Sequence, residues 1–181
     1  MTFDVIYADP PWSYSGQQDK WGAAAKFYDT MTDEDIYNLP VNDLLAERGV
    51  VFLWATGPKL HLAMEAIKRW GLHYRGVAFV WVKTRKDGVP LRAMGVRPSI
   101  VKPITEFVLA ASKVKEGRPM PLSSEKVVQT VFAPRREHSR KPDEVRDRIE
   151  ELYPGARKLE MFARTTTEGW EVHGNETDKF A

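Results

Sequence analysis

Four consecutive residues, Asp9-Pro10-Pro11-Trp12, combine groups suited to chemistry on an aromatic amine. The exocyclic amine of adenine is a poor nucleophile because its lone pair is delocalised into the ring, so a catalyst must hold both amine hydrogens. The Asp9 carboxylate can accept one hydrogen bond, and the Pro10 carbonyl, held by restricted proline torsions, can accept the other. Trp12 offers a flat face on which a base can stack. The motif predicts that the positioned amine attacks a methyl donor directly, without a covalent intermediate on the protein. The plainer interpretation is a rigid turn with Trp12 in the core.

The segments around this motif indicate an α/β fold. Residues 3–8 are apolar except for Asp4 and predict a buried strand that ends at Asp9. Further strands are predicted at 50–54, 76–82, 104–111, 127–132 and 159–163. Helical patterns alternate with them, which predicts a mostly parallel sheet between helices in one domain spanning residues 1–181. Ligands bind beyond the carboxyl ends of such strands, so residues 9–12, 55–58 and 163–164 are candidate ligand positions.

Three helices carry recognisable signals. Thr32 can cap an acidic run at 33–37, and Pro142 opens a helix over residues 143–153. Between them, a helix that ends at Gly71 is expected to turn one apolar face inward, formed by Leu60, Ala63, Met64 and Ile67. The segment 13–31 lacks periodicity, and a loop of that length is usually functional.

Charge is segregated along the chain although the formal net charge is only +2. Residues 1–48 hold nine acidic and three basic side chains, whereas residues 83–118 hold nine basic and three acidic ones. A basic segment of this kind favours contact with a phosphate backbone, and the plainer interpretation is a solvated loop.

The composition argues against several other classes of protein. Cysteine is absent and the four histidines are dispersed, so disulfides and a metal cofactor are not expected. No apolar run approaches the roughly 20 residues of a membrane span, and residues 1–4 lack a secretory pattern, so we expect a cytoplasmic protein that does not contact membranes.

Several segments, taken in order, resemble the adenine-N6 methyltransferase family that includes the catalytic subunit of the eukaryotic mRNA methyltransferase and small bacterial and phage members. The resemblance covers nearly the whole chain. The segments that carry it are Ile6-Tyr7-Ala8-Asp9-Pro10-Pro11-Trp12, Phe27-Tyr28-Asp29-Thr30-Met31, Val51-Phe52-Leu53-Trp54, Val80-Trp81-Val82-Lys83-Thr84, Ser139-Arg140-Lys141-Pro142-Asp143-Glu144, Glu160-Met161-Phe162-Ala163-Arg164 and Gly174-Asn175-Glu176.

The resemblance implies a Rossmann-like domain dependent on S-adenosylmethionine, in which the catalytic strand precedes the cofactor-binding segment. It implies a catalytic role for Asp9, Pro10, Pro11 and Trp12. It implies cofactor contacts from Asp9, Lys141, Glu160, Arg164, Asn175 and Glu176. Tyr28 matches an aromatic residue in a loop that closes over the family's active site. With the basic segments, this makes Tyr28, Lys83, Arg135, Arg136 and Arg140 candidate substrate-binding residues.

The substrate implied is adenine in nucleic acid. Small size, no evident RNA-binding module and the phage-like resemblance favour DNA over RNA, and in a duplex the base would have to be flipped out of the stack. The alternatives are an RNA methyltransferase, a non-catalytic nucleic-acid-binding subunit beside an active partner, or a nucleotide-binding regulator. A homodimer or a partner subunit is compatible with the sequence.

Overall fold

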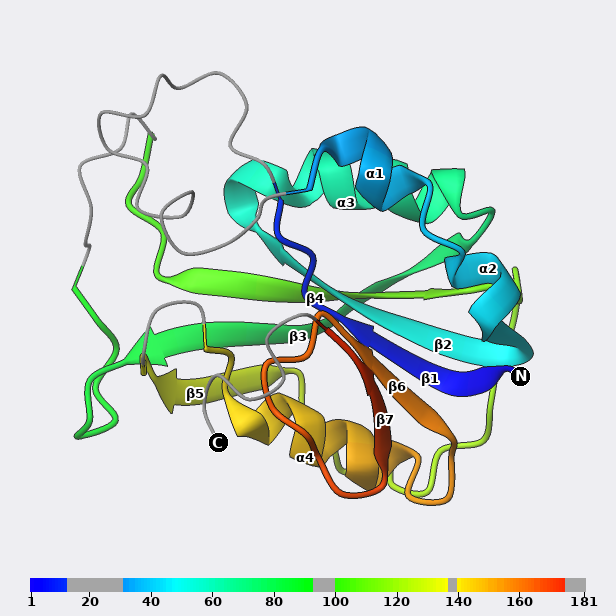
Figure 1. Ribbon diagram of the computed structural model, residues 1–181. Coiled ribbons are helices and arrows are strands. Elements are labelled where there is room, and N and C mark those ends of the chain that lie inside the picture. The colour runs from blue at the N-terminus through cyan, green and yellow to red at the C-terminus, as the bar shows by residue number, and fades with distance from the viewer. Residues whose placement is uncertain (13–30, 93–99, 137–139, 175–181) are drawn as a thin grey trace.

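The computed structural model describes residues 1–12, 31–92, 100–136 and 140–174, and over these ranges seven strands form one sheet. The strands are β1 (Phe3–Ala8), β2 (Leu45–Thr56), β3 (His73–Thr84), β4 (Thr105–Ser112), β5 (Thr130–Pro134), β6 (Lys158–Met161) and β7 (Trp170–His173). Their order across the sheet is β5-β3-β4-β2-β1-β6-β7 (Figure 1).

Strand β1, an interior strand next to the central β2, is paired in parallel with both of its neighbours, β2 and β6. The pairings of β3 with β5 and of β6 with β7 are also parallel. Only β4 runs the other way, antiparallel to β2 and β3. The prediction of a mostly parallel sheet is therefore confirmed, with one reversed strand inserted into it.

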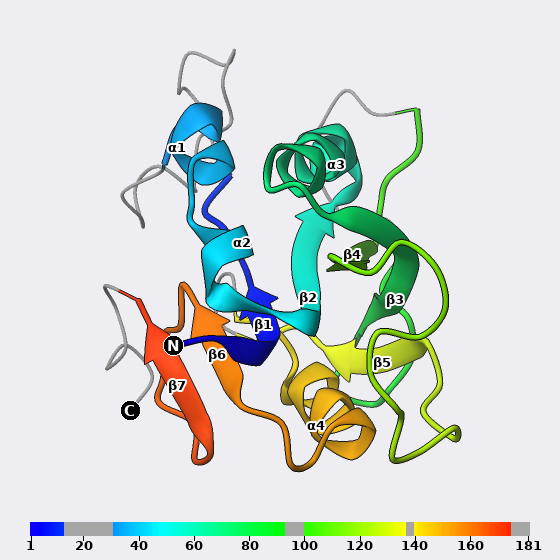
Figure 2. The same ribbon diagram turned by 90° about the vertical axis from the view of Figure 1, so that its right-hand side faces the viewer.

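Helices cover both faces of the sheet. One face packs under α1 (Asp33–Tyr37), α2 (Val41–Leu44) and α3 (Leu60–Arg69), and the other face packs against α4 (Asp143–Leu152); a 3-10 turn, Gly57–Lys59, leads into α3 (Figures 1 and 2). Alternate residues of β1 separate the two cores: Ile6 and Ala8 belong to the first, and Val5 and Tyr7 to the second. This alternation places the side chains on either side of Asp9's strand in different layers.

The helix signals are confirmed with one exception. Thr32 caps α1 through a capping box with Asp35. Gly71 ends the turn after α3 with a φ of 70°. This is a left-handed backbone conformation, which glycine adopts at little cost in free energy. Met64 was predicted to face inward but is 40% exposed, because the buried face of α3 runs through Ala63 and Ile67.

Several strand ends differ from the predictions. The strand expected at 127–132 begins only at Thr130. The strand expected at 159–163 spans Lys158–Met161, because Phe162 has a positive φ of 64° that ends the extended backbone. The edge strand β7 was not predicted. In the described part of the chain, no helix is long and apolar enough to cross a bilayer.

Candidate active site

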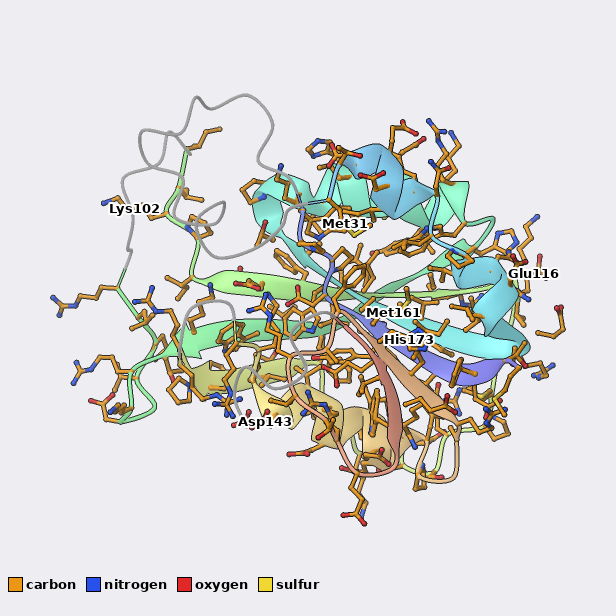
Figure 3. All side chains as sticks on the ribbon, viewed as in Figure 1. Met31, Lys102, Glu116, Asp143, Met161 and His173 are labelled. Carbon is orange, nitrogen blue, oxygen red and sulfur yellow. The ribbon has the colours of Figure 1, made fainter. Side chains whose placement is uncertain are left out.

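A pocket lies where the carboxyl ends of β1 and β6 meet the start of α4. Its lining carries charges of both signs and consists of Tyr7, Asp9, Arg140, Lys141, Asp143, Arg146, Glu160, Phe162, Arg164 and Thr165. The parallel register of β1 and β6 sets Tyr7 opposite Glu160. Figure 3 shows Asp143 at the start of α4 and Met161 at the end of β6. The pocket occupies the end of the sheet where ligand positions were predicted.

Four side chains predicted from the resemblance to hold the cofactor line this pocket, although they are far apart in sequence: Asp9, Lys141, Glu160 and Arg164. The other two, Asn175 and Glu176, lie outside the described residues, as does Tyr28. Within the ranges that are described, no group of three or more histidine or acidic side chains is arranged to hold a metal ion.

Asp9 lies directly after β1 and is paired with a lysine. Its Oδ1 atom is 3.3 Å from the Lys141 Nζ atom, and its side chain is 24% exposed. Burial raises the pKa of the Asp9 carboxyl, Lys141 opposes that rise, and the nearby Glu106 carboxylate reinforces it. Lys141 therefore favours the ionised form of the carboxylate, which is the form that accepts hydrogen bonds.

Glu106 of β4 is a site residue that the sequence reasoning missed. Its carboxylate bridges two lysines, with Oε2 2.8 Å from Lys141 Nζ and Oε1 2.7 Å from Lys83 Nζ. Although burial alone would raise its pKa, Lys141 and Lys83 lower the pKa of Glu106 to about 2. The result is a chain of alternating charges, Lys83–Glu106–Lys141–Asp9, that ends at the pocket.

The Trp12 ring is packed in the core, which corrects the expectation that it offers an open face on which a base can stack. Its side chain belongs to the first core and is only 8% exposed. Its indole N–H donates to the Trp54 carbonyl at 3.1 Å, and the Trp54 indole donates to the Tyr7 hydroxyl at 2.7 Å. The structure thus supports the plainer interpretation for Trp12, in which its ring fixes the turn that carries Asp9.

The Pro10 carbonyl, which was expected to accept a hydrogen bond from the adenine amine, also closes a tight turn. It accepts the Trp12 backbone N–H at 2.8 Å. Because a carbonyl oxygen has two lone pairs, one remains able to accept a hydrogen bond from a ligand. The turn therefore holds this oxygen in a defined direction next to Asp9.

Glu160 of β6 is held by an arginine that the sequence reasoning also missed. Arg146 of α4 donates from Nε to Oε2 at 3.1 Å and from Nη2 to Oε1 at 3.0 Å. Such a two-point contact fixes both the position and the plane of the carboxylate. Polar positions on an amphipathic helix carry no signal that singles out Arg146, so the pair is visible only in the fold.

The basic residues predicted to meet substrate fall into different surroundings. Lys83 lies in the charged chain, 5.0 Å from the centre of the Trp81 ring, and Arg140 lines the pocket. Arg136 donates to Asp143 at 2.7 Å and to the Lys141 carbonyl at 2.8 Å, which ties the segment before α4 to its first turn. Arg135 is exposed.

Backbone hydrogen bonds hold the end of β6 against the end of β7, and we call this contact of Phe162 and Ala163 with His173 and Gly174 the lock. The backbone N–H groups of Phe162 and Ala163 both donate to the His173 carbonyl, at 2.6 and 3.2 Å. A Cβ atom at Gly174 would overlap the Ala163 carbonyl oxygen, so this close approach requires glycine. The lock fixes where the chain leaves β7, immediately before Asn175.

The chain is similar to known methyltransferases. A sequence model of the MT-A70 family matches residues 3–176. The Type II methyltransferase M.MunI of Mycoplasma sp is 33% identical over 192 residues, covering 96% of this chain and 77% of the relative. The human N(6)-adenosine-methyltransferase catalytic subunit METTL3 is 32% identical over 180 residues, covering 97% of this chain. The chain spans only 28% of the length of that human relative.

Proposed function

The chain belongs to the MT-A70 family of S-adenosylmethionine-dependent methyltransferases, and we propose that it methylates the N6 amine of adenine in DNA. The observation that carries the proposal is the placement of Asp9. Its carboxylate follows β1, is held by Lys141, and lines the same pocket as Glu160 and Arg164.

The side chains in the pocket fit S-adenosylmethionine. That molecule carries a positive sulfonium and amine, a negative carboxylate and ribose hydroxyls. The pocket offers carboxylates at Asp9, Asp143 and Glu160, and cations at Lys141 and Arg164. We propose that Asn175 and Glu176, which follow the lock at Gly174, complete the set. When bound, the cofactor supplies a methyl group on a sulfonium, which is an electrophile.

Asp9 and the Pro10 carbonyl would each accept one hydrogen of the adenine amine. Holding both hydrogens turns the nitrogen lone pair out of conjugation with the ring and toward the methyl group. In the transfer, a bond from the nitrogen to the methyl carbon would form as the bond from that carbon to sulfur broke. The nitrogen then loses one proton to Asp9, whose pKa is raised by burial and which is therefore a better acceptor than an exposed aspartate.

The remaining residues of the site act by positioning. Trp12 and its hydrogen bond to Trp54 hold the Asp9 turn against the core. Arg140 lines the pocket. We propose that it attracts phosphates together with Lys83, Arg135 and Arg136, without specifying a sequence. The preference for DNA is supported by the small size of the chain, which spans 77% of the Mycoplasma Type II methyltransferase but only 28% of the human N(6)-adenosine-methyltransferase subunit.

The test is methyl transfer from labelled S-adenosylmethionine to duplex DNA, single-stranded DNA and RNA of the same sequence. We expect label in DNA, at a rate reduced about 100- to 1,000-fold in Asp9→Asn, which keeps the shape of the side chain and removes its charge. Transfer to RNA alone would replace DNA by RNA as the substrate. Cofactor binding without transfer to any polymer would favour the alternative of a non-catalytic subunit.

A further inference from the structure

The contact between Arg146 and Glu160 is more buried and has better-defined geometry than a surface ion pair. The Arg146 and Glu160 side chains are 18% and 12% exposed. The guanidinium meets both carboxylate oxygens, and its Nη1 atom lies 3.6 Å from Asp143 Oδ1. Asp143 in turn accepts from Arg136 at 2.7 Å. Arg146 is therefore fixed from two sides.

The contact with Arg146 leaves some lone pairs of the Glu160 carboxylate free to accept further hydrogen bonds. A carboxylate has about four lone-pair directions, and the two contacts with Arg146 use one on each oxygen. Glu160 lines the pocket, so the remaining lone pairs are available to a ligand there. Arg146 also lines the pocket, but its Nε and Nη2 donors are already engaged with Glu160.

Resting on the proposed function for the identity of the ligand, we propose that Arg146 is a positioning residue for S-adenosylmethionine. It holds Glu160 as an ionised acceptor in one orientation, ready to receive a hydroxyl or ammonium donor of the cofactor. The contribution of Arg146 to cofactor affinity is thus made through Glu160.

Glu160 needs such a partner because its surroundings disfavour its charge. Burial raises the pKa of Glu160, the neighbouring carboxylates Asp9 on the β1 side and Asp143 on α4 add to the rise, and Arg146 opposes it. Tyr7 faces Glu160 from β1 as a neutral phenol, since burial and Glu160 itself raise its pKa. From β7 the residue opposite Glu160 is Val172, which carries no charge.

The pocket holds other cations besides Arg146. Lys141 is engaged with Asp9 and Glu106, while Arg140 and Arg164 line the pocket beside the pair. Removal of Arg146 would leave Glu160 between two carboxylates in a poorly hydrated site. Its protonated form would then become populated at mildly acidic pH, and a protonated carboxyl loses acceptor capacity.

The experiment measures the Kd of S-adenosylmethionine by calorimetry between pH 5.5 and 7.0, a range below the titration of the ligand's own amine. Arg146→Met should bind about 10- to 100-fold more weakly at pH 5.5, and the deficit relative to the unaltered protein should narrow as the pH rises. Arg146→Lys keeps the charge without the two-point contact and should show a smaller deficit with little pH dependence.

Two further variants separate a route through Glu160 from general damage. Glu160→Gln should lose affinity equally at every pH, and adding Arg146→Met to it should cost little more. The matched control is Arg148→Met on the same helix, where the arginine contacts the carbonyls of Val128 and Thr130; its Kd should not change. A pH-independent deficit in Arg146→Met, or additive losses in the double variant, would overturn the inference. Absence of binding by the unaltered protein would overturn the proposed function and this inference together.

Discussion

Replacing Lys141 by methionine is expected to move the acidic limb of the pH–rate profile toward higher pH. Asp9 must be ionised to accept a hydrogen of the adenine amine, so activity falls as the pH drops through the Asp9 pKa. That pKa is raised by burial, and Lys141 is the main influence that lowers it. Without the lysine, the pKa of Asp9 rises further, and a larger fraction of the enzyme is inactive at a given acidic pH.

The size of the shift follows from the contact distance. For unit charges 3.3 Å apart, Coulomb's law with an effective dielectric constant of about 20 gives about 5 kcal/mol. Water around the exposed quarter of Asp9 weakens this, and an opposite charge at such a distance commonly shifts a carboxyl pKa by about 1–3 units. We therefore expect the limb to move by about 1–3 pH units.

The assay is kcat/KM for the nucleic acid at saturating S-adenosylmethionine, measured across the acidic range. Lys83→Met is the matched control. Lys83 pairs with Glu106, as Lys141 does, but only Lys141 is also paired with Asp9 among the described residues. Its acidic limb should move much less than that of Lys141→Met. An unmoved limb in Lys141→Met, or equal shifts in both variants, would refute the assignment of Lys141 as the partner that keeps Asp9 ionised.

Three further predictions concern the supports of the site. Trp12→Phe removes the indole hydrogen bond to Trp54 and should lower the free energy of unfolding by about 1 kcal/mol in urea titrations. Gly174→Ala forces a methyl group onto a backbone oxygen and should weaken S-adenosylmethionine binding in calorimetry, whereas Gly155→Ala, with open space around the added methyl, should not. Glu106 has a folded pKa of about 2, so it stabilises the protein above its unfolded pKa of about 4.3. That stability is lost as the pH falls toward 2, and unfolding titrations of Glu106→Gln should show a weaker loss over this range.

The sequence predicted the strand that carries Asp9 because its evidence is local. A six-residue run that is apolar except for Asp4, followed by Asp9 and two prolines, identifies both the strand and its end. The capping box of α1 and the glycine after α3 are equally local. Met64 was misjudged because apolar periodicity alone does not say which edge of a helix face becomes covered.

The charged partners could not be predicted, because they depend on contacts between distant segments. Glu106 sits in an apolar strand, and its role appears only when β4 is inserted between β2 and β3. Arg146 is one of several arginines on a helix until the packing of α4 brings it to Glu160. The four-residue strand β7 has too little pattern to be distinguished from a loop, and its place is set by pairing with β6.

The most direct test of the account is the identity of the methylated nucleoside. DNA methylated by the unaltered protein with labelled S-adenosylmethionine would be digested to nucleosides and analysed by mass spectrometry, with Asp9→Asn treated in parallel. The account predicts label in N6-methyladenine, nearly absent from the Asp9→Asn sample. Label in another nucleoside, or undiminished N6-methyladenine without the Asp9 carboxylate, would contradict the assignment of Asp9 as the group that holds the adenine amine.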